Sequence, residues 1–215
     1  MPRPLLALAA LAAVLACRSA RPEAPPSVPP PDFRPLNGFA AQRVAVLPAQ
    51  RLRPVDSLAW GAHAPAGRAY LVALDSALAA QLTERGLGSV WALASDVERA
   101  ARRNVAHAPD PRVLAVNPLM PRRNAPPEDI PEPLASQLRT LVALTDARYA
   151  LVPVELRFEK GAEGPGRAVL RVALLDARAS TVTWSGDVAG DSSATLSAAL
   201  AASPAARLAD LIAAP

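Results

Sequence analysis

The chain has few of the residues from which catalytic and metal sites are usually built. Cysteine occurs once, at Cys17, so the 215 residues contain no pair that could form an internal disulfide. Histidine occurs twice, at His63 and His107, in loop-like surroundings and without the spacing of a metal-binding pair. The Gly-x-Ser-x-Gly motif of hydrolases is missing. We therefore predict a protein that is not an enzyme and holds no metal or cofactor.

Aromatic residues and lysine are also scarce. Aromatics make up 4% of the chain, and Lys160 is the only lysine beside 22 arginines. The formal net charge of +4 is therefore carried by arginine, and the tightest basic groups are Arg102-Arg103 and Arg122-Arg123. Nucleic-acid binding favours a clustered basic surface with interleaved aromatics, which this sequence does not provide. We predict no nucleic-acid partner.

Long apolar runs are absent after Cys17, so no membrane-spanning helix is expected there. The start of the chain is different, because Arg3 is followed by twelve apolar residues, Leu5–Ala16. A helix of that length spans roughly 18 Å, against roughly 30 Å of membrane hydrocarbon. The run is thus too short to remain as a membrane span and is typical of an export signal.

Cys17 follows Leu15-Ala16 directly, an arrangement that resembles the lipobox of bacterial lipoproteins. There, signal peptidase II cuts before the cysteine, whose thiol then carries a diacylglycerol. The resemblance implies that residues 1–16 are a lipoprotein signal peptide and that Cys17 is the lipidation site. An ordinary secretory signal with an incidental cysteine is the alternative. Arg18, rather than Asp, follows the cysteine, which resembles the enterobacterial pattern for the outer membrane facing the periplasm; the choice between inner and outer membrane stays open.

Residues 17–41 are predicted to form a proline-rich tether. Seven prolines lie between Pro22 and Pro35, a composition that favours the extended polyproline conformation over packing. About 24 such residues reach roughly 70 Å at about 3.1 Å each. The stretch is interpreted either as a spacer that holds the domain away from the membrane or as a leader without a selected length.

Residues 42–215 are predicted to form a single α/β envelope domain, in which short apolar runs mark strands and spacings of three and four mark helices. Three alternating runs near the C-terminus, joined by short loops, predict an antiparallel meander. The fold class is thus a small mixed sheet with amphipathic helices packed on it and this C-terminal meander. The predicted strands are 43–48, 88–94, 113–116, 148–159, 167–176 and 181–188, and the predicted helices are 68–85, 95–104, 133–145 and 194–213, the last broken at Ser203-Pro204.

Alternation assigns side chains of the meander to faces. Trp184 is predicted to lie in the core because it shares a face with Val182 and Val188. In the first strand of the meander, one face is apolar and the other is charged and expected to be solvated. The apolar residues are Val154, Leu156 and Phe158, and the charged ones are Glu155, Arg157 and Glu159.

Two further motifs have simple interpretations. Gly86-Leu87-Gly88 joins a helix to a strand, the reverse of the order in a phosphate-binding loop, so we expect Gly86 to end the helix in a left-handed conformation. Glu128, Asp129 and Glu132 form an acidic group beside prolines, which is interpreted as an interaction loop or simply as solvated charge.

The meander also resembles a known pattern. Ala147-Arg148-Tyr149 opens a strand, and the run from Leu174 to Gly186 reads LLDARASTVTWSG. Both resemble the curli-secretion lipoprotein, the lipoprotein activator of penicillin-binding protein and the amino-terminal domain of the Tol-Pal propeller protein. The resemblance covers residues 42–48 and 134–190, and departs from the family where Ala179-Ser180 replaces the usual glycine of the turn. It implies an α/β domain that binds partner proteins and has no active site.

These observations predict a membrane-anchored envelope lipoprotein that acts as a non-catalytic docking or assembly factor for an envelope, secretion or cell-wall complex. Its expected partners are the membrane, through the lipid on Cys17, and another envelope protein; the oligomeric state stays open. One alternative is a glycan-binding or peptidoglycan-acting protein. A second is a secretion-channel subunit, which the prolines between Asn104 and Glu132 argue against because proline cannot donate to a strand ladder.

Overall fold

The computed structural model describes residues 34–53, 58, 60, 67–120, 129–160 and 165–214. The predicted export signal, Cys17, His63 and Glu128 lie outside the described residues, as does the tether up to Phe33.

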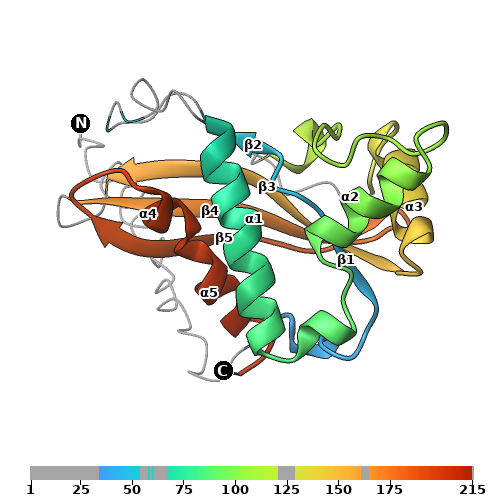
Figure 1. The fold of residues 1–215 in the computed structure, drawn as a ribbon, viewed down its shortest axis with the longest axis horizontal. Helices are drawn as coiled ribbons and strands as arrows, with labels where there is room; N and C mark the ends of the chain where they lie inside the picture. Colours follow the sequence, from blue (N-terminus) through green and yellow to red (C-terminus); the bar gives the residue numbers. More distant parts are fainter. Residues whose placement is uncertain are drawn as a thin grey trace, which may run out of the picture. The chain divides into compact units, whose positions relative to one another are not determined.

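The sheet is mixed and has the strand order β1-β3-β4-β5 (Figure 1). β3 (Tyr149–Lys160), β4 (Gly166–Asp176) and β5 (Thr181–Ser193) form the predicted antiparallel meander. β1 (Val44–Val46) and the short β2 (Arg51–Leu52) both pair with β3 in parallel. The predicted α/β class, with its mixed sheet and C-terminal meander, is confirmed.

Helices cover the two faces of the sheet unequally. α1 (Gly67–Glu84), α4 (Ala198–Ala202) and α5 (Pro204–Asp210) pack together on one face, in front of the sheet in Figure 1. α2 (Ala94–Arg103) and α3 (Leu134–Leu144) pack on the opposite face, beside β1 and the start of β3. Three short 3-10 helices complete the described elements, at Asn37–Phe39, Leu87–Ser89 and Asn117–Leu119.

Two predicted strands are wrong. Of the strand expected over 88–94, only an isolated bridge between Ala92 and Ala45 forms, because the chain first makes a 3-10 turn at Leu87–Ser89. The strand expected over 113–116 is irregular, although Leu114 and Val116 are buried against α3 as single anchors. In both places, a short apolar run of four to seven residues indicated that the segment is buried and not that it pairs as a strand.

Two bulges overturn the predicted alternation. The register of β3 shifts between Pro153 and Glu155, so Val154 packs beneath α2 and α3, whereas Leu156 and Phe158 pack on the α1 side. A second shift separates Val182 from Trp184 in the same way. One extra residue sends all later side chains to the other face. Trp184 is half-buried on the α1 side with Val188, not with Val182.

The ends of the packed chain also differ from expectation. Leu36 is buried, and its N–H donates to the carbonyl of Leu211 at 3.1 Å, so packing begins before the predicted boundary at Gln42. The closing helix starts at Ala198 because β5 continues to Ser193. Pro204 opens α5 as predicted, but the Ser203 hydroxyl does not cap that helix; it donates to Leu200 and accepts from the N–H of Asp191.

Candidate functional site

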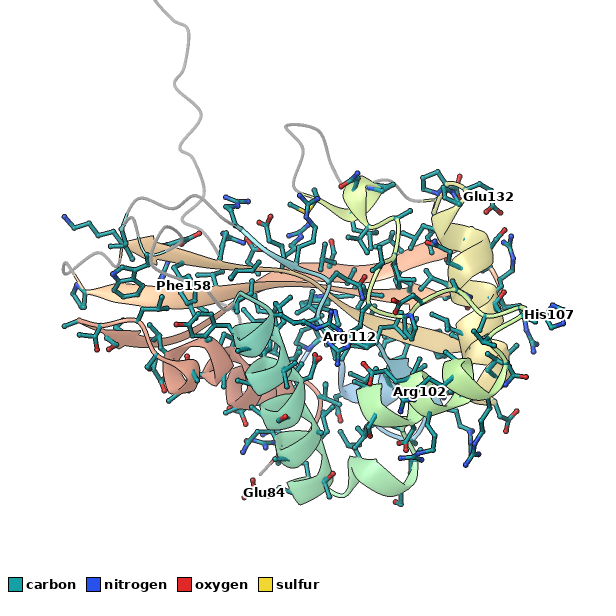
Figure 2. The ribbon with its side chains drawn as sticks, turned by 45° about the horizontal axis from the view of Figure 1, so that its top comes forward. Glu84, Arg102, His107, Arg112, Glu132 and Phe158 are labelled. Atoms are coloured by element: carbon teal, nitrogen blue, oxygen red, sulfur yellow. The ribbon has the colours of Figure 1, made fainter. Side chains whose placement is uncertain are left out.

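A groove lies where the first turns of α1, the end of α2 and the segment 105–113 meet. It consists of two neighbouring cavities of about 410 and 340 Å³, which share Arg68, Asp110 and Arg112 in their walls. Volumes of this size are typical of ligand or peptide subsites. We call it the Arg112 groove, after the side chain at its centre (Figure 2).

Arg112, which lines both cavities, joins α1 to α2. Its Nη1 lies 3.1 Å from Oδ2 of Asp75 on α1, and its Nε lies 2.5 Å from Oε1 of Glu98 on α2. Asp75 also accepts the N–H of Ala49 at 2.8 Å. Burial raises the pKa of the Asp75 carboxyl above its usual value, while the Ala49 N–H and Arg112 act against that rise. Arg112 is thus held by a hydrogen bond to Asp75 and by an ion pair with Glu98, and it serves as a structural clamp.

The walls of the groove combine apolar and charged side chains. Val105 and Val113 are 83% and 72% exposed, although both are apolar. Arg102, on the last turn of α2, keeps most of its surface in water and is 3.5 Å from Glu98, while Arg68 is exposed at the opposite wall. Because Asp110 stands in the walls of both cavities, the lining offers apolar surface together with charges of both signs.

A second polar feature covers part of the sheet face opposite α1. It consists of Arg157, Glu159, Arg167, Arg171 and Asp187, and we call it the charged sheet face. Arg157 lies 2.7 Å from Glu159 and 2.8 Å from Asp187. Arg167 and Arg171 each lie 3.3 Å from a carboxylate, Glu159 and Asp187 respectively.

The charged sheet face is more buried than the predicted solvated face. The Arg157 side chain is only 11% exposed, and the neighbouring Glu155 is 4% exposed and paired with Arg53 at 2.5 Å. Burial raises the pKa of Asp187, but the hydrogen bond and charge of Arg157, with the charge of Arg171, more than offset it and hold the pKa below the usual value. The charges are therefore paired within the sheet, although Nη1 of Arg157 and the Nε atoms of Arg167 and Arg171 are buried without a hydrogen-bond partner among the described residues.

The other singled-out residues are distributed over the surface. His107 lies on the segment after α2 and points away from Arg112 (Figure 2). Glu132 and Asp129 do not act as one cluster: Asp129 forms a bridge with Thr181, and Glu132 accepts from the Ser136 N–H and from Arg139. Hydrogen bonds from Ser136 and Arg139 lower the pKa of Glu132. Glu132 therefore steadies the first turn of α3.

Gly86 takes the left-handed conformation predicted for it, with φ of 78°. The turn between β4 and β5 has Ala179-Ser180 and no glycine, and Ser180 itself adopts a φ of 55°. Asp176 stabilises this turn by accepting the N–H groups of Arg178 and Ala179, both at 3.0 Å.

Sequence reasoning missed the Asp75–Arg112–Glu98 clamp. A signal was present, since Asp75 stands beside Leu74 on the helix face that also carries Leu78 and Leu82, where an acid is out of place. The partner Arg112 could not be inferred, because it comes from an irregular segment 37 residues away.

Within the described ranges, no group of three or more histidine, cysteine or acidic side chains is arranged to hold a metal ion. Within the same ranges, no helix combines the length and the apolar character needed to cross a membrane.

No family profile and no curated protein matches the sequence. Among solved structures, the chain is similar to the PelC dodecamer from Paraburkholderia phytofirmans, with 15% identity over 82% of this chain and 91% of that chain and a TM-score of 0.40. It is also similar to the LpoB C-terminal domain from Escherichia coli (13% identity, 70% and 83% covered, TM-score 0.33).

Lipoprotein GNA1162 from Neisseria meningitidis is a third such structure, with 18% identity, 72% and 84% covered and a TM-score of 0.36. At this level of identity and superposition, the likenesses assign no function to the chain.

Proposed function

We propose that the chain is a lipid-anchored envelope protein that docks another envelope component through its α/β domain and catalyses no reaction. The observation that carries the proposal is the apolar run Leu5–Ala16, too short to span a membrane and ending at the only cysteine of the sequence. A diacylglycerol on Cys17 would supply the anchor, since several buried acyl chains bind a membrane far more firmly than one. We propose that the protein is anchored in the outer membrane and faces the periplasm.

The Arg112 groove supports a docking role. Its central arginine is held by two carboxylates and so is not poised for chemistry, while the exposed valines beside it form an apolar surface that a partner can cover. The prolines before Arg34 would set the reach of the domain from the membrane.

The anchor is tested by replacing Cys17 with Ala and following the protein through membrane fractionation. The parent chain should remain with membranes, and C17A should be released or retained only as unprocessed precursor. Arg18→Ala is the matched control, because it alters the next residue and leaves the modified sulfur in place. Mass spectrometry of the mature N-terminus must show an acylated cysteine; an unmodified one would contradict the proposal.

The docking role is tested separately, by crosslinking the membrane-bound chain and identifying what it captures. Capture that is lost when Val105 and Val113 are both changed to Asp would place the partner at the Arg112 groove. Turnover of purified peptidoglycan by the same chain would overturn the non-catalytic part of the proposal and favour the peptidoglycan-acting alternative.

A further inference from the structure

β5 is an edge strand, and among the described residues its outer side is covered only near its ends. It pairs with β4 on one side, and on the other side a bridge joins Thr181 to Asp129. Near the far end, the N–H of Asp191 donates to the Ser203 hydroxyl at 2.9 Å. Gly190 permits that approach, because a Cβ there would lie 2.1 Å from the Ser203 oxygen. Between these two contacts, residues 183–189 have no strand partner on the outer side among the described elements. We call them the open edge.

The open edge lacks the usual protection against pairing. Edge strands are commonly protected from pairing by a lysine, a proline or a bulge. The open edge, with the sequence TWSGDVA, contains neither lysine nor proline. The two register shifts that involve β5 fall outside its centre, so pairing with β4 is regular from Trp184 to Ala189. The single charge, Asp187, is neutralised by Arg157 and Arg171 of the same sheet. Another strand can therefore approach without meeting an uncompensated charge.

The open edge is also complementary to itself. Thr181 and Asp191, where the two covering contacts lie, are each five residues from Gly186. A two-fold axis through Gly186 would therefore place a second copy symmetrically along the open edge. Antiparallel pairing about that axis places Trp184 opposite Val188 of the second copy, and Ser185 opposite Asp187. Aromatic and β-branched residues stabilise each other across strands, and no like charges meet.

We propose that two copies of this chain pair through β5, antiparallel about Gly186, and so join their sheets into one. Each outer backbone group of the open edge then gains a partner from the second copy. The paired stretch is short, and its stability therefore rests on the proposed membrane anchor, which raises the effective concentration of the copies.

The pairing is tested by cysteine crosslinking, which is simple because the sequence has only one cysteine of its own, Cys17. In the full membrane-bound chain, Ser185→Cys provides one reactive thiol, because the acylated Cys17 does not react with a maleimide; the unaltered chain serves as the blank. The two Cα atoms of residue 185 would lie about 8 Å apart in the proposed pair, within reach of a short bismaleimide. Ser192→Cys is the matched control on the same strand, since its two copies would lie roughly 40 Å apart.

We expect about tenfold more crosslinked dimer from Ser185→Cys than from Ser192→Cys. Adding Ala189→Lys to the Ser185→Cys chain should lower that yield several-fold without changing its thermal unfolding, because an edge lysine keeps a second strand away. Equal yields at both positions, no dimer from Ser185→Cys, or an adduct with a different protein would each overturn the proposal. Recovery of an unacylated chain in the soluble fraction would instead count against the anchor, which is scored in the same samples.

Discussion

One face of the sheet is apolar at one end and charged at the other. Towards the start of β3, the side chains of Ala150, Val152, Ala173 and Leu175 are buried beneath α2 and α3. Further along the same strands the face becomes the charged sheet face. The change occurs within β4, where Arg171 and Ala173 are two residues apart and point to the same side.

The difference teaches that helix cover decides which residues a strand can carry. Beneath α2 and α3, only small and apolar side chains fill the space. At the other end, Val169 is also buried, with only 3% of its surface exposed, although it does not belong to the cluster that these helices cover. Arg157 faces it across the strands, and the aliphatic stems of arginine can cover apolar surface while their charged ends pair. Ion pairs between strands thus replace a helix layer.

The largest effect is expected from moving an arginine into the covered end. Ala173→Arg buries a charge that has no partner beneath α3, and we expect it to lower the free energy of unfolding by about 3–5 kcal/mol or to prevent folding. The matched control is Ala189→Arg, on the same face but exposed, for which we expect a change within about 0.5 kcal/mol. Urea unfolding of the C17A chain measures both, and similar losses from the two variants would contradict the comparison.

A smaller effect is expected from breaking the charged sheet face itself. A double-mutant cycle of Arg157→Met and Asp187→Asn should give a coupling energy of about 1 kcal/mol, because the arginine is largely buried while the carboxylate is partly exposed. The same cycle on Arg99 and Asp96, an exposed pair on α2, should give a coupling near zero. Equal coupling in the two cycles would show that the sheet adds nothing to the ion pairs.

Sequence patterns predicted the regular parts of the fold. Helix α1 follows from leucines at spacings of three and four, and the meander follows from alternation over three long runs. The first bulge left a local signal, because proline inside a strand is confined to edges and bulges and Pro153 stands beside it, but the second bulge, after Val182, left none. Groupings that crossed those points, of Val154 with Leu156 and of Val182 with Trp184, were therefore wrong, although the strands were right and so were the groupings on either side of each bulge.

The candidate site was less predictable than the fold. The Arg112 groove joins residues of α1, α2 and an irregular segment, so its geometry depends on tertiary packing alone. The burial of Arg157 in the charged sheet face and of the neighbouring Glu155 was missed for the same reason, since both look solvated until their partners Asp187 and Arg53 are known.

The smallest effect is expected from pH, and it has opposite signs in the two polar regions. The folded-state pKa of Asp187 lies below its usual value, so its contribution to stability is full above about pH 5 and is lost as the pH falls through about 4 and below. Asp187→Asn should therefore lower the Tm at pH 7, and its difference from the parent should shrink towards pH 3.

Asp75 provides the contrast, because burial raises its folded-state pKa and the folded protein then binds a proton more readily than the unfolded chain. Its titration adds stability as the pH falls through that raised value, so the advantage of the parent over Asp75→Asn should grow towards low pH. Thermal unfolding between pH 7 and 3 measures both variants against the parent. If the Tm differences of the two variants from the parent changed in the same direction with pH, the opposite pKa shifts of Asp75 and Asp187 would be contradicted. A carboxyl buried between helices and a carboxylate neutralised on a sheet surface should respond to protons in opposite ways.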